Sequence, residues 1–460
     1  MTKEFILQKL YEKYIRPTEG NTDRFIGVEI EMPIVNLNRQ AVDFAVIHEL
    51  TKRFCERFGF TVAGIDDEGN AYCAQKKENG DILSYDCSYN NLELSFGREH
   101  DLNIIHNRFH EYYAFIQQYF EPYRYTLTGM GVNPYRKYNR NFPVPNGRYR
   151  MLYHHLHSYR KYEGLMDFHP FPEFGTFSSA SQVQLDVNAD RLVQTLNVMN
   201  RLEPLKVLLL CNSVMPDYDK DLLCCRDVFW EKSTHGINPK NIGMYDAELG
   251  TLDDVLDYIA GTSIYCVERG DKYINFTPVN IVEFLQSDSV TGEYYDNGVY
   301  REITVEPDIG DLKTLRTFKF EDLTFRGTIE YRSSCTQPIS SSMALPALQI
   351  GLLEKLDELD KLLRNDDAVY QHGYSPKQLR EMLIRRPLPD FIDKDRLYDL
   401  LGQIVDLAAD GLKDRNLGEE KYLAPLYDRI ARRETPAETM LNAPDSGTSM
   451  EDVIQQFAQV

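Results

Sequence analysis

The sequence predicts an α+β fold, in which helices pack on the outer face of a curved, mainly antiparallel β-sheet and the other face forms a basin. Several short segments alternate apolar and polar residues with the period of two of a β-strand. Longer segments between them carry apolar residues at helical spacing. The chain has 460 residues, of which 42% are hydrophobic and 27% charged, values typical of a globular protein with a large core.

The charge balance narrows the classes of partner. The formal net charge is −20, whereas nucleic acids and anionic membranes bind proteins with a large positive surface. We therefore expect small-molecule substrates, no nucleic acid and no membrane, and the number of subunits stays open. The eight cysteines form no Cys-x-x-Cys pair, no apolar run approaches the roughly 20 residues of a membrane span, and the start of the chain lacks a signal-peptide pattern. These features predict free thiols and a cytoplasmic location.

The first two-faced strand lies within residues 24–35. Between Ile26 and Met32 the even-numbered residues are apolar, whereas Glu29 and Glu31 share the other face. Two carboxylates on one face require a cation, a basic side chain or water beside them. Taken alone, this segment also fits a strand whose polar face meets solvent.

Three later segments also have one apolar face and one polar face. Glu93 lies opposite apolar neighbours in 92–96, and Glu330 and Arg332 lie opposite Ile329 and Tyr331 in 328–332. In 178–187, three polar side chains alternate with apolar ones: Gln182, Gln184 and Asp186. If these strands are neighbours, their polar faces form a basin of carboxylates and amides, which suits Mg²⁺ or Mn²⁺. A metal basin with arginines at its edge suits phosphoryl transfer.

Local signals place the other elements. Thr2 caps a first helix that Pro17 ends, and Asn79-Gly80 favours a hairpin turn before 82–85. Apolar spacing predicts further helices over about 41–58, 99–120, 190–210 (capped by Asp190), 251–259, 343–363, 375–385 and 393–412. Residues 286–297 read as a loop, and 434–448, with two prolines and a glycine, as a loosely ordered stretch.

A basic and aromatic region spans residues 123–163. It suits either a solvated surface or a site for phosphate or an amino-acid carboxylate, because arginine forks match those groups. The net charge argues against the third option, single-stranded nucleic acid. His154, His155 and His157 lack the spacing of a helical metal pair, so we expect structural or substrate-facing roles. The chain contains no Walker loop, dinucleotide fingerprint or His-Glu-x-x-His motif.

The ordered set of motifs resembles the glutamate-cysteine ligase family, especially its plant and actinobacterial branch. The resemblance covers about residues 22–363 and rests on Gly27-Val28-Glu29-Ile30-Glu31, Leu92-Glu93-Leu94-Ser95, Ser179 to Asp186, and Gly327 to Arg332 with Gln337-Pro338. Asn133-Pro134, Arg148 to Met151, and Asn212-Ser213 before Arg226 and Trp230 are also similar.

The resemblance implies a glutamine synthetase/guanido kinase-like fold that binds ATP, Mg²⁺ and glutamate. It implies a catalytic domain over 1–363 and a C-terminal helical extension over 364–460 that packs on it. The implied metal ligands are Glu29, Glu31, Glu93, Gln182 and Glu330. The implied catalytic residues are Arg226, Glu330 and Arg332. The implied substrate- and nucleotide-binding residues are Arg148, Tyr149, Ser181, Gln184, Asp186 and Trp230.

The implied reaction joins the γ-carboxylate of glutamate to the amine of cysteine through γ-glutamyl phosphate. The chain departs from the family pattern at Gln184, Ser179 and Ser334-Cys335, and the loop 238–241 lacks an expected arginine. These departures leave open a ligase of the same type with a different amine acceptor. A non-catalytic binding protein that keeps the fold is the remaining alternative.

Overall fold

The computed structural model describes all 460 residues, and its centre is a nine-stranded sheet. The strands follow the order β14-β15-β7-β1-β5-β4-β3-β2, with β6 also paired to β1, and every neighbouring pair is antiparallel. Their bounds are β1 Ile26–Asn36, β2 Thr61–Ile65, β3 Ala71–Gln75, β4 Ile82–Tyr85, β5 Asn91–Glu99, β6 Tyr125–Leu127, β7 Ser181–Asp186, β14 Glu321–Leu323 and β15 Thr328–Tyr331.

The four two-faced strands are consecutive in this sheet, in the order β15-β7-β1-β5. Their register brings the polar residues together: Glu31 lies opposite Glu93, Glu29 opposite Gln182, and Glu330 opposite Gln184. The predicted fold class, a largely antiparallel sheet combined with helices, is confirmed. We call the polar face of these four strands the basin.

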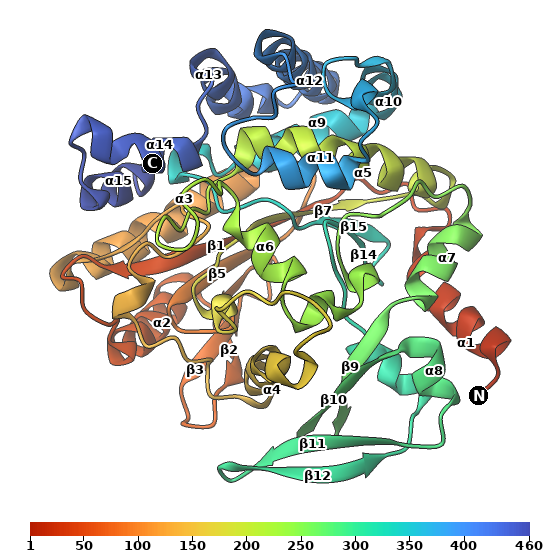
Figure 1. Ribbon diagram of the computed structural model, residues 1–460. Helices are drawn as coiled ribbons and strands as arrows, with labels where there is room; N and C mark the ends of the chain where they lie inside the picture. The colour runs from red at the N-terminus through yellow and green to blue at the C-terminus, as the bar shows by residue number, and fades with distance from the viewer.

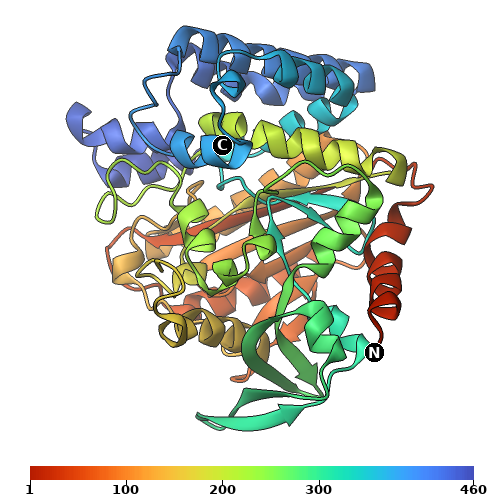
Figure 2. The ribbon, with the colours of Figure 1, turned by 45° about the vertical axis from the view of Figure 1, so that its right-hand side comes forward.

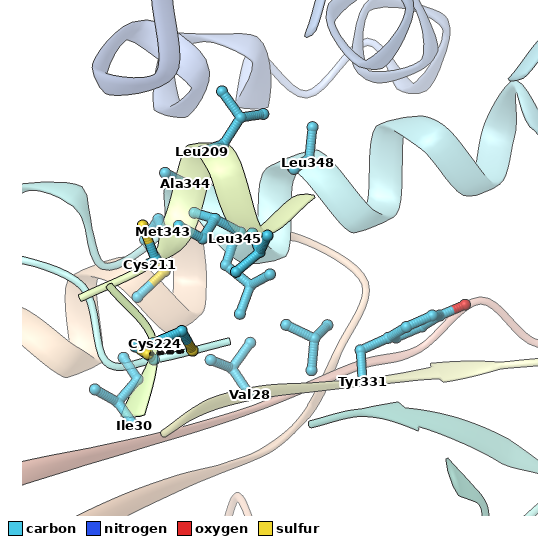
Figure 3. Close-up of a cluster of buried hydrophobic side chains, with 14 of the residues drawn as sticks. Val28, Ile30, Leu209, Cys211, Cys224, Tyr331, Met343, Ala344, Leu345 and Leu348 are labelled. Atoms are coloured by element: carbon cyan, nitrogen blue, oxygen red, sulfur yellow. Dashed lines mark hydrogen bonds between the residues drawn. The ribbon is translucent and has the colours of Figure 1, made fainter. Parts of the chain in front are cut away.

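Helices cover the apolar face of the sheet (Figure 1). Figure 3 shows Val28 and Ile30 of β1 directed toward the layer that holds Leu345, where α5 and α9 lie above the sheet. On the other half, Phe96 of β5 stacks on Tyr112 of α3, with ring centroids 6.2 Å apart. The helices are α2 Phe44–Phe58, α3 Leu102–Phe120, α5 Ala189–Leu210 and α9 Ala344–Glu354.

A second layer lies on the basin side and includes a four-stranded sheet of order β12-β11-β10-β9 (Figures 1 and 2). Its strands are β9 Ser263–Arg269, β10 Lys272–Asn280, β11 Val290–Asp296 and β12 Val299–Val305. Other elements of this side are α1 Lys3–Leu10, α4 Gly147–His157, α6 Cys225–Glu231, α7 Leu252–Ala260, α8 Ile281–Gln286, and the parallel pair β8 Ile242–Gly243 and β13 Phe318–Lys319.

The C-terminal helices lie on the helical side of the sheet, around α3, α5 and α9 (Figure 1). They are α10 Leu356–Asn365, α11 Pro376–Leu383, α12 Lys394–Arg415, α13 Ala424–Arg432, α14 Pro436–Asn442 and α15 Met450–Phe457. The backbones of α9 and α12 approach so closely that a Cβ on Gly351 would lie 2.1 Å from the carbonyl oxygen of Ala408. One hydrophobic core of 100 residues extends from Ile15 to Phe457, and the division at residue 363 stays a prediction.

Four local predictions are wrong. Residues 286–297 include β11, and 434–448 include α14, whose first turn is closed by a capping box of Thr435 and Glu438. The helix predicted over 343–363 is two helices that meet at Lys355, whose φ and ψ of −115° and 33° are not helical. Asn188, not Asp190, caps α5, because its side chain accepts the first free backbone N–H.

Two further observations concern the chain as a whole. All eight cysteines carry free thiols. None of the helices is both long and apolar enough to cross a membrane.

Candidate active site

A cavity of about 120 Å³ lies between the basin and the segments that carry α4, α6 and β13. It is lined on the charged side by Glu31, Asp86, Arg148, Gln182, Arg226, Arg316 and Arg332, and on the apolar side by residues that include Met151, Leu156, Phe174, Trp230, Tyr265, Phe318 and Phe320. The predicted residues that share this cavity are Glu31, Arg148, Tyr149, Gln182, Arg226, Trp230 and Arg332.

Arg226 is held on α6 with an unused donor. The residue is 6% exposed, and Nη1 donates to the carbonyl oxygen of Ser333 at 3.3 Å. Its Nε is buried without any hydrogen-bond partner. A buried, unpaired donor of a cation is costly, so this position favours an anionic group that would accept from it.

The aromatic side chains of the cavity lie beside its arginines. Trp230 of α6 stacks on Phe318 of β13 with ring centroids 4.5 Å apart and an angle of 22° between the planes. The guanidinium of Arg332 lies 5.7 Å from the centre of the Phe318 ring. One cavity therefore offers both an aromatic surface and several cationic side chains, which suits an anionic ligand with an apolar or planar part.

The carboxylates of the basin repel one another. Burial together with Asp86 raises the pKa of Glu31 to about 8, and burial together with Asp86 and Glu31 raises the pKa of Glu93 to about 8. Burial together with Glu330 and Glu93 raises the pKa of Glu29 well above its ordinary value. The nearby arginines therefore do not fully offset the burial and mutual repulsion of Glu29, Glu31 and Glu93.

Amide side chains tie these carboxylates together. Gln184 donates through Nε2 to Glu29 at 3.0 Å and to Glu330 at 2.9 Å. Gln182 donates through Nε2 to Glu31 at 3.0 Å, and its Oε1 is buried without a partner. The amides therefore hold the carboxylates at fixed places along the basin.

The donor set fits a hard divalent cation. Carboxylates with raised pKa and the unpartnered Oε1 of Gln182 are oxygen ligands of the kind Mg²⁺ takes. No three His, Cys, Asp or Glu side chains yet lie close enough together to hold an ion in this arrangement. Side-chain rotations in the basin would have to bring them together, and the metal assignments stay a prediction.

The structure separates two predicted residues from the site. Ser181 pairs with Ile30 and is buried on the apolar face, because successive residues of a strand point to opposite sides. Asp186 lies at the far end of β7, where it accepts from the backbone N–H of Phe25 at 2.7 Å and from Asn21 at 3.3 Å. Neither residue lines the cavity: Ser181 faces the core, and Asp186 anchors residues 21–25. Their role in substrate binding stays a prediction.

Several residues of the site were not predicted. Asp86 and Arg316 line the cavity, and Asp322 of β14 lies opposite Glu330 on the basin side of the sheet. Burial raises the pKa of Asp322 to about 6. Asp86 follows β4 directly, and polar residues at strand ends are a usable signal, but nothing in the sequence marks Arg316.

Comparison with known proteins assigns the chain to a protein family. The model of the Glutamate-cysteine ligase family 2 matches residues 25–459. The chain belongs to this family. The resemblance noted in its motifs is thereby confirmed, and the glutamate-cysteine ligase family match includes the C-terminal helices.

Individual relatives are distant. The chain is 24% identical over 355 residues to the chloroplastic glutamate–cysteine ligase of Arabidopsis thaliana, an alignment that covers 72% of the chain and 60% of the relative. It is 23% identical over 353 residues to the ligase of Brassica juncea, with 72% and 61% covered. The chain thus spans about three-fifths of these curated relatives' length.

Among solved structures, the glutamate–cysteine ligase of Francisella tularensis in complex with AMP is similar at a TM-score of 0.47 and 12% identity, covering 96% of this chain and 89% of that one. A bifunctional glutathione synthetase from Pasteurella multocida is similar at a TM-score of 0.43 and 11% identity, covering 100% and 53%.

Proposed function

We propose that this glutamate-cysteine ligase family member is an ATP-dependent, ADP-forming ligase that joins the γ-carboxylate of glutamate to the amine of cysteine. One observation carries the proposal: a single cavity brings the cations Arg148, Arg226 and Arg332 against the acidic basin that begins at Glu31 and Gln182. A site that must hold a nucleotide triphosphate and a dicarboxylate needs cations for both anions and oxygen ligands for a metal.

The proposed reaction proceeds in two steps. The γ-phosphoryl group passes to the γ-carboxylate, which releases ADP; the amine then attacks the acyl carbon, loses a proton and expels phosphate. Arg226 and Arg332 would hold anionic oxygens of the reactants in place, which lowers the entropic barrier. Glu29, Glu31, Glu93, Gln182 and Glu330 would hold Mg²⁺ or Mn²⁺, which neutralises phosphate charge when bound.

The acceptor is the open part of the proposal. Ser179 donates to Asn91 at 2.7 Å and is fully buried, and Cys335 lies buried beside Cys224, so neither departure from the family pattern lines the cavity. Gln184 contacts two basin carboxylates instead. These departures alter packing or metal contacts, and cysteine remains the proposed acceptor.

The test is coupled ADP release. Purified protein receives Mg-ATP and glutamate, and single amines are then added in turn. Cysteine should give the largest rate of ADP formation together with a γ-glutamyl product detected by mass spectrometry. ADP with other amines but not with cysteine would select a ligase of another specificity. If no amine leads to ADP formation, the protein is not this enzyme, and a non-catalytic binding protein remains. A cytoplasmic location, suited to eight free thiols, also stays a prediction.

A further inference from the structure

Arg380 of α11 is a cation from the C-terminal region that is buried in the centre of the molecule, with 3% of its surface exposed. Its Nε and Nη2 donate to the two carboxylate oxygens of Asp227 at 2.7 and 3.1 Å. Its Nη1 donates to the carboxylate of Glu203 at 2.5 Å and to the backbone carbonyl of the same residue at 2.8 Å. Three nitrogens of one planar group are thus used, which only a guanidinium can do.

Both acidic partners lead directly to the arginines of the cavity. Asp227 is the residue after Arg226 in α6. Glu203 accepts from the hydroxyl of Ser333 at 3.1 Å, and Ser333 is the residue after Arg332. The carbonyl oxygen of Ser333 also accepts from Arg226. Arg380 is therefore connected to the segments that carry Arg226 and Arg332, through Asp227 and through Glu203 and Ser333, while it does not itself line the cavity.

The charges of this buried cluster balance only when Arg380 is present. Glu203 pairs with both Lys206 and Arg380, and Arg380 also pairs with Asp227. Burial beside Glu203 raises the pKa of Glu321, the fifth ionisable residue of the cluster, well above its ordinary value. These ion pairs set the two cations Lys206 and Arg380 against Glu203 and Asp227. Loss of one buried partner leaves an uncompensated charge that can reorient the segments around it.

We propose that Arg380 is a positioning residue for the ligase reaction: it fixes α6 and the segment after β15 relative to each other, so that Arg226 and Arg332 face the same ligand. This inference rests on the proposed function for its kinetic consequence. Misplacement of a cavity group by about 1 Å can cost about 100-fold in rate even when the change lies far from the chemistry. The C-terminal helix α11 therefore supports the cavity arginines Arg226 and Arg332 without lining the cavity.

The test uses the full chain and two readouts. Arg380→Met removes the guanidinium group. Arg380→Lys keeps the positive charge but cannot make the hydrogen bonds to Asp227 and Glu203 at the same time. Trp230 is the only tryptophan and lines the cavity, so its fluorescence reports ligand binding without turnover. We expect Arg380→Met to weaken Mg-ATP or glutamate binding about tenfold and to lower kcat/KM about 100-fold, with partial rescue in Arg380→Lys.

Arg108→Met is the matched control. Arg108 also bridges two carboxylates, Asp81 and Glu99, and it does not line the cavity. This variant should lose thermal stability while its Trp230 titration stays as in the parent. If Arg380→Met binds both ligands like the parent, or if Arg108→Met weakens binding equally, the positioning role is overturned.

The test also covers misfolding of Arg380→Met and ligand binding without turnover in the parent. Should Arg380→Met fail to fold, Asp227→Asn and Arg380→Lys carry the test, and parental binding in both overturns the proposal. Should the parent bind ligands without turnover, the proposed function fails on its own, while the binding comparison still decides whether Arg380 positions the cavity arginines.

Discussion

Arg332 donates through Nη1 to the carboxylate of Glu330 at 2.7 Å, and the two side chains lie on the same face of the chain at β15. The sequence places both residues on the polar face of the strand and predicts that Glu330 faces a solvent-filled basin. The side chain of Glu330 is instead only 10% exposed, whereas that of Arg332 is 25% exposed. Glu330 is thus held between a cation and Gln184, which fixes its orientation in the basin.

Glu330→Gln should abolish turnover and leave the fold intact. The amide retains an oxygen that can accept from Arg332 but removes the negative charge expected to meet a metal ion. We expect ADP formation to fall about 100-fold or more and the free energy of unfolding to change by about 1 kcal/mol. Activity assays and thermal unfolding separate these effects; a large drop in stability with activity retained would show a structural role.

Arg226→Lys should weaken the binding of an anionic substrate. A lysine keeps the charge but lacks the Nε that is buried and unpaired in the parent. We expect the KM for glutamate or ATP to rise about tenfold or more, since one charge-assisted hydrogen bond is lost. Arg191→Lys, on the exposed surface of α5, is the control and should leave both values unchanged.

The ligand-free protein should become less stable as the pH rises. Glu31 and Glu93 have pKa values of about 8 in the fold against an ordinary 4.5. Between these values the native state binds more protons at these two groups than the unfolded state does. Their contribution to stability is therefore greatest below about 4.5 and is lost as the pH rises through about 8. Thermal unfolding at about pH 5.5 and about pH 8.5 measures this trend.

Mg²⁺ should reverse the same trend. A cation in the basin favours the ionised carboxylates, so its stabilising effect should increase with pH and its binding near neutral pH should release protons. The double variant Glu31→Gln/Glu93→Gln should lose both effects. A Mg²⁺ response that is equal at low and high pH would place the ion outside this basin.

The contact between α9 and α12 gives a stability test with an internal control. A Cβ on Gly411 would lie 2.1 Å from the carbonyl oxygen of Gly351, whereas a Cβ on Gly402 of the same helix meets nothing within 4 Å. Gly411→Ala should therefore destabilise the protein by about 1 to 3 kcal/mol. Gly402→Ala should be neutral or stabilising by about 0.5 kcal/mol. Equal denaturant midpoints for the two variants would mean that α9 and α12 can move apart without loss of stability, which contradicts the prediction.

Sequence alone was sufficient where one physical pattern dominated. The alternation in β1 identified Glu29 and Glu31, and its repetition in three other segments predicted their adjacency, because an antiparallel sheet with one buried face favours neighbours that share the same pattern. The capping residue Thr2 marked the start of the first helix correctly, since it accepts a backbone N–H that the helix leaves free. The helices expected from residues 375 and 393 also start there, where Ser375 and Asp393 cap them.

Sequence failed where long-range packing decided the role of a residue. Ser181 and Asp186 lie in the same motif as Gln182, yet the first faces the core and the second anchors residues 21–25. No local pattern marks Arg316, and the helical pattern around Arg380 does not show that this side chain is buried against α6. Only the folded topology brings Arg316 to the cavity and Arg380 to the segments beside it. The strand β11 was missed because its residues 290–296 are mostly exposed or half-buried, which leaves no apolar face to detect.

The two-faced register of β1 also sets which genetic changes this protein can tolerate. Substitutions at Glu29 or Glu31 alter chemistry and leave the frame of the strand intact. Deletion of a single codon between Ile26 and Glu31 would instead reverse the direction of the side chains on one side of the deletion, so that carboxylates enter the helix layer while aliphatic groups enter the basin. Lineages that change the specificity of this site are therefore constrained to exchange residues within β1 and to place insertions in the loops around it.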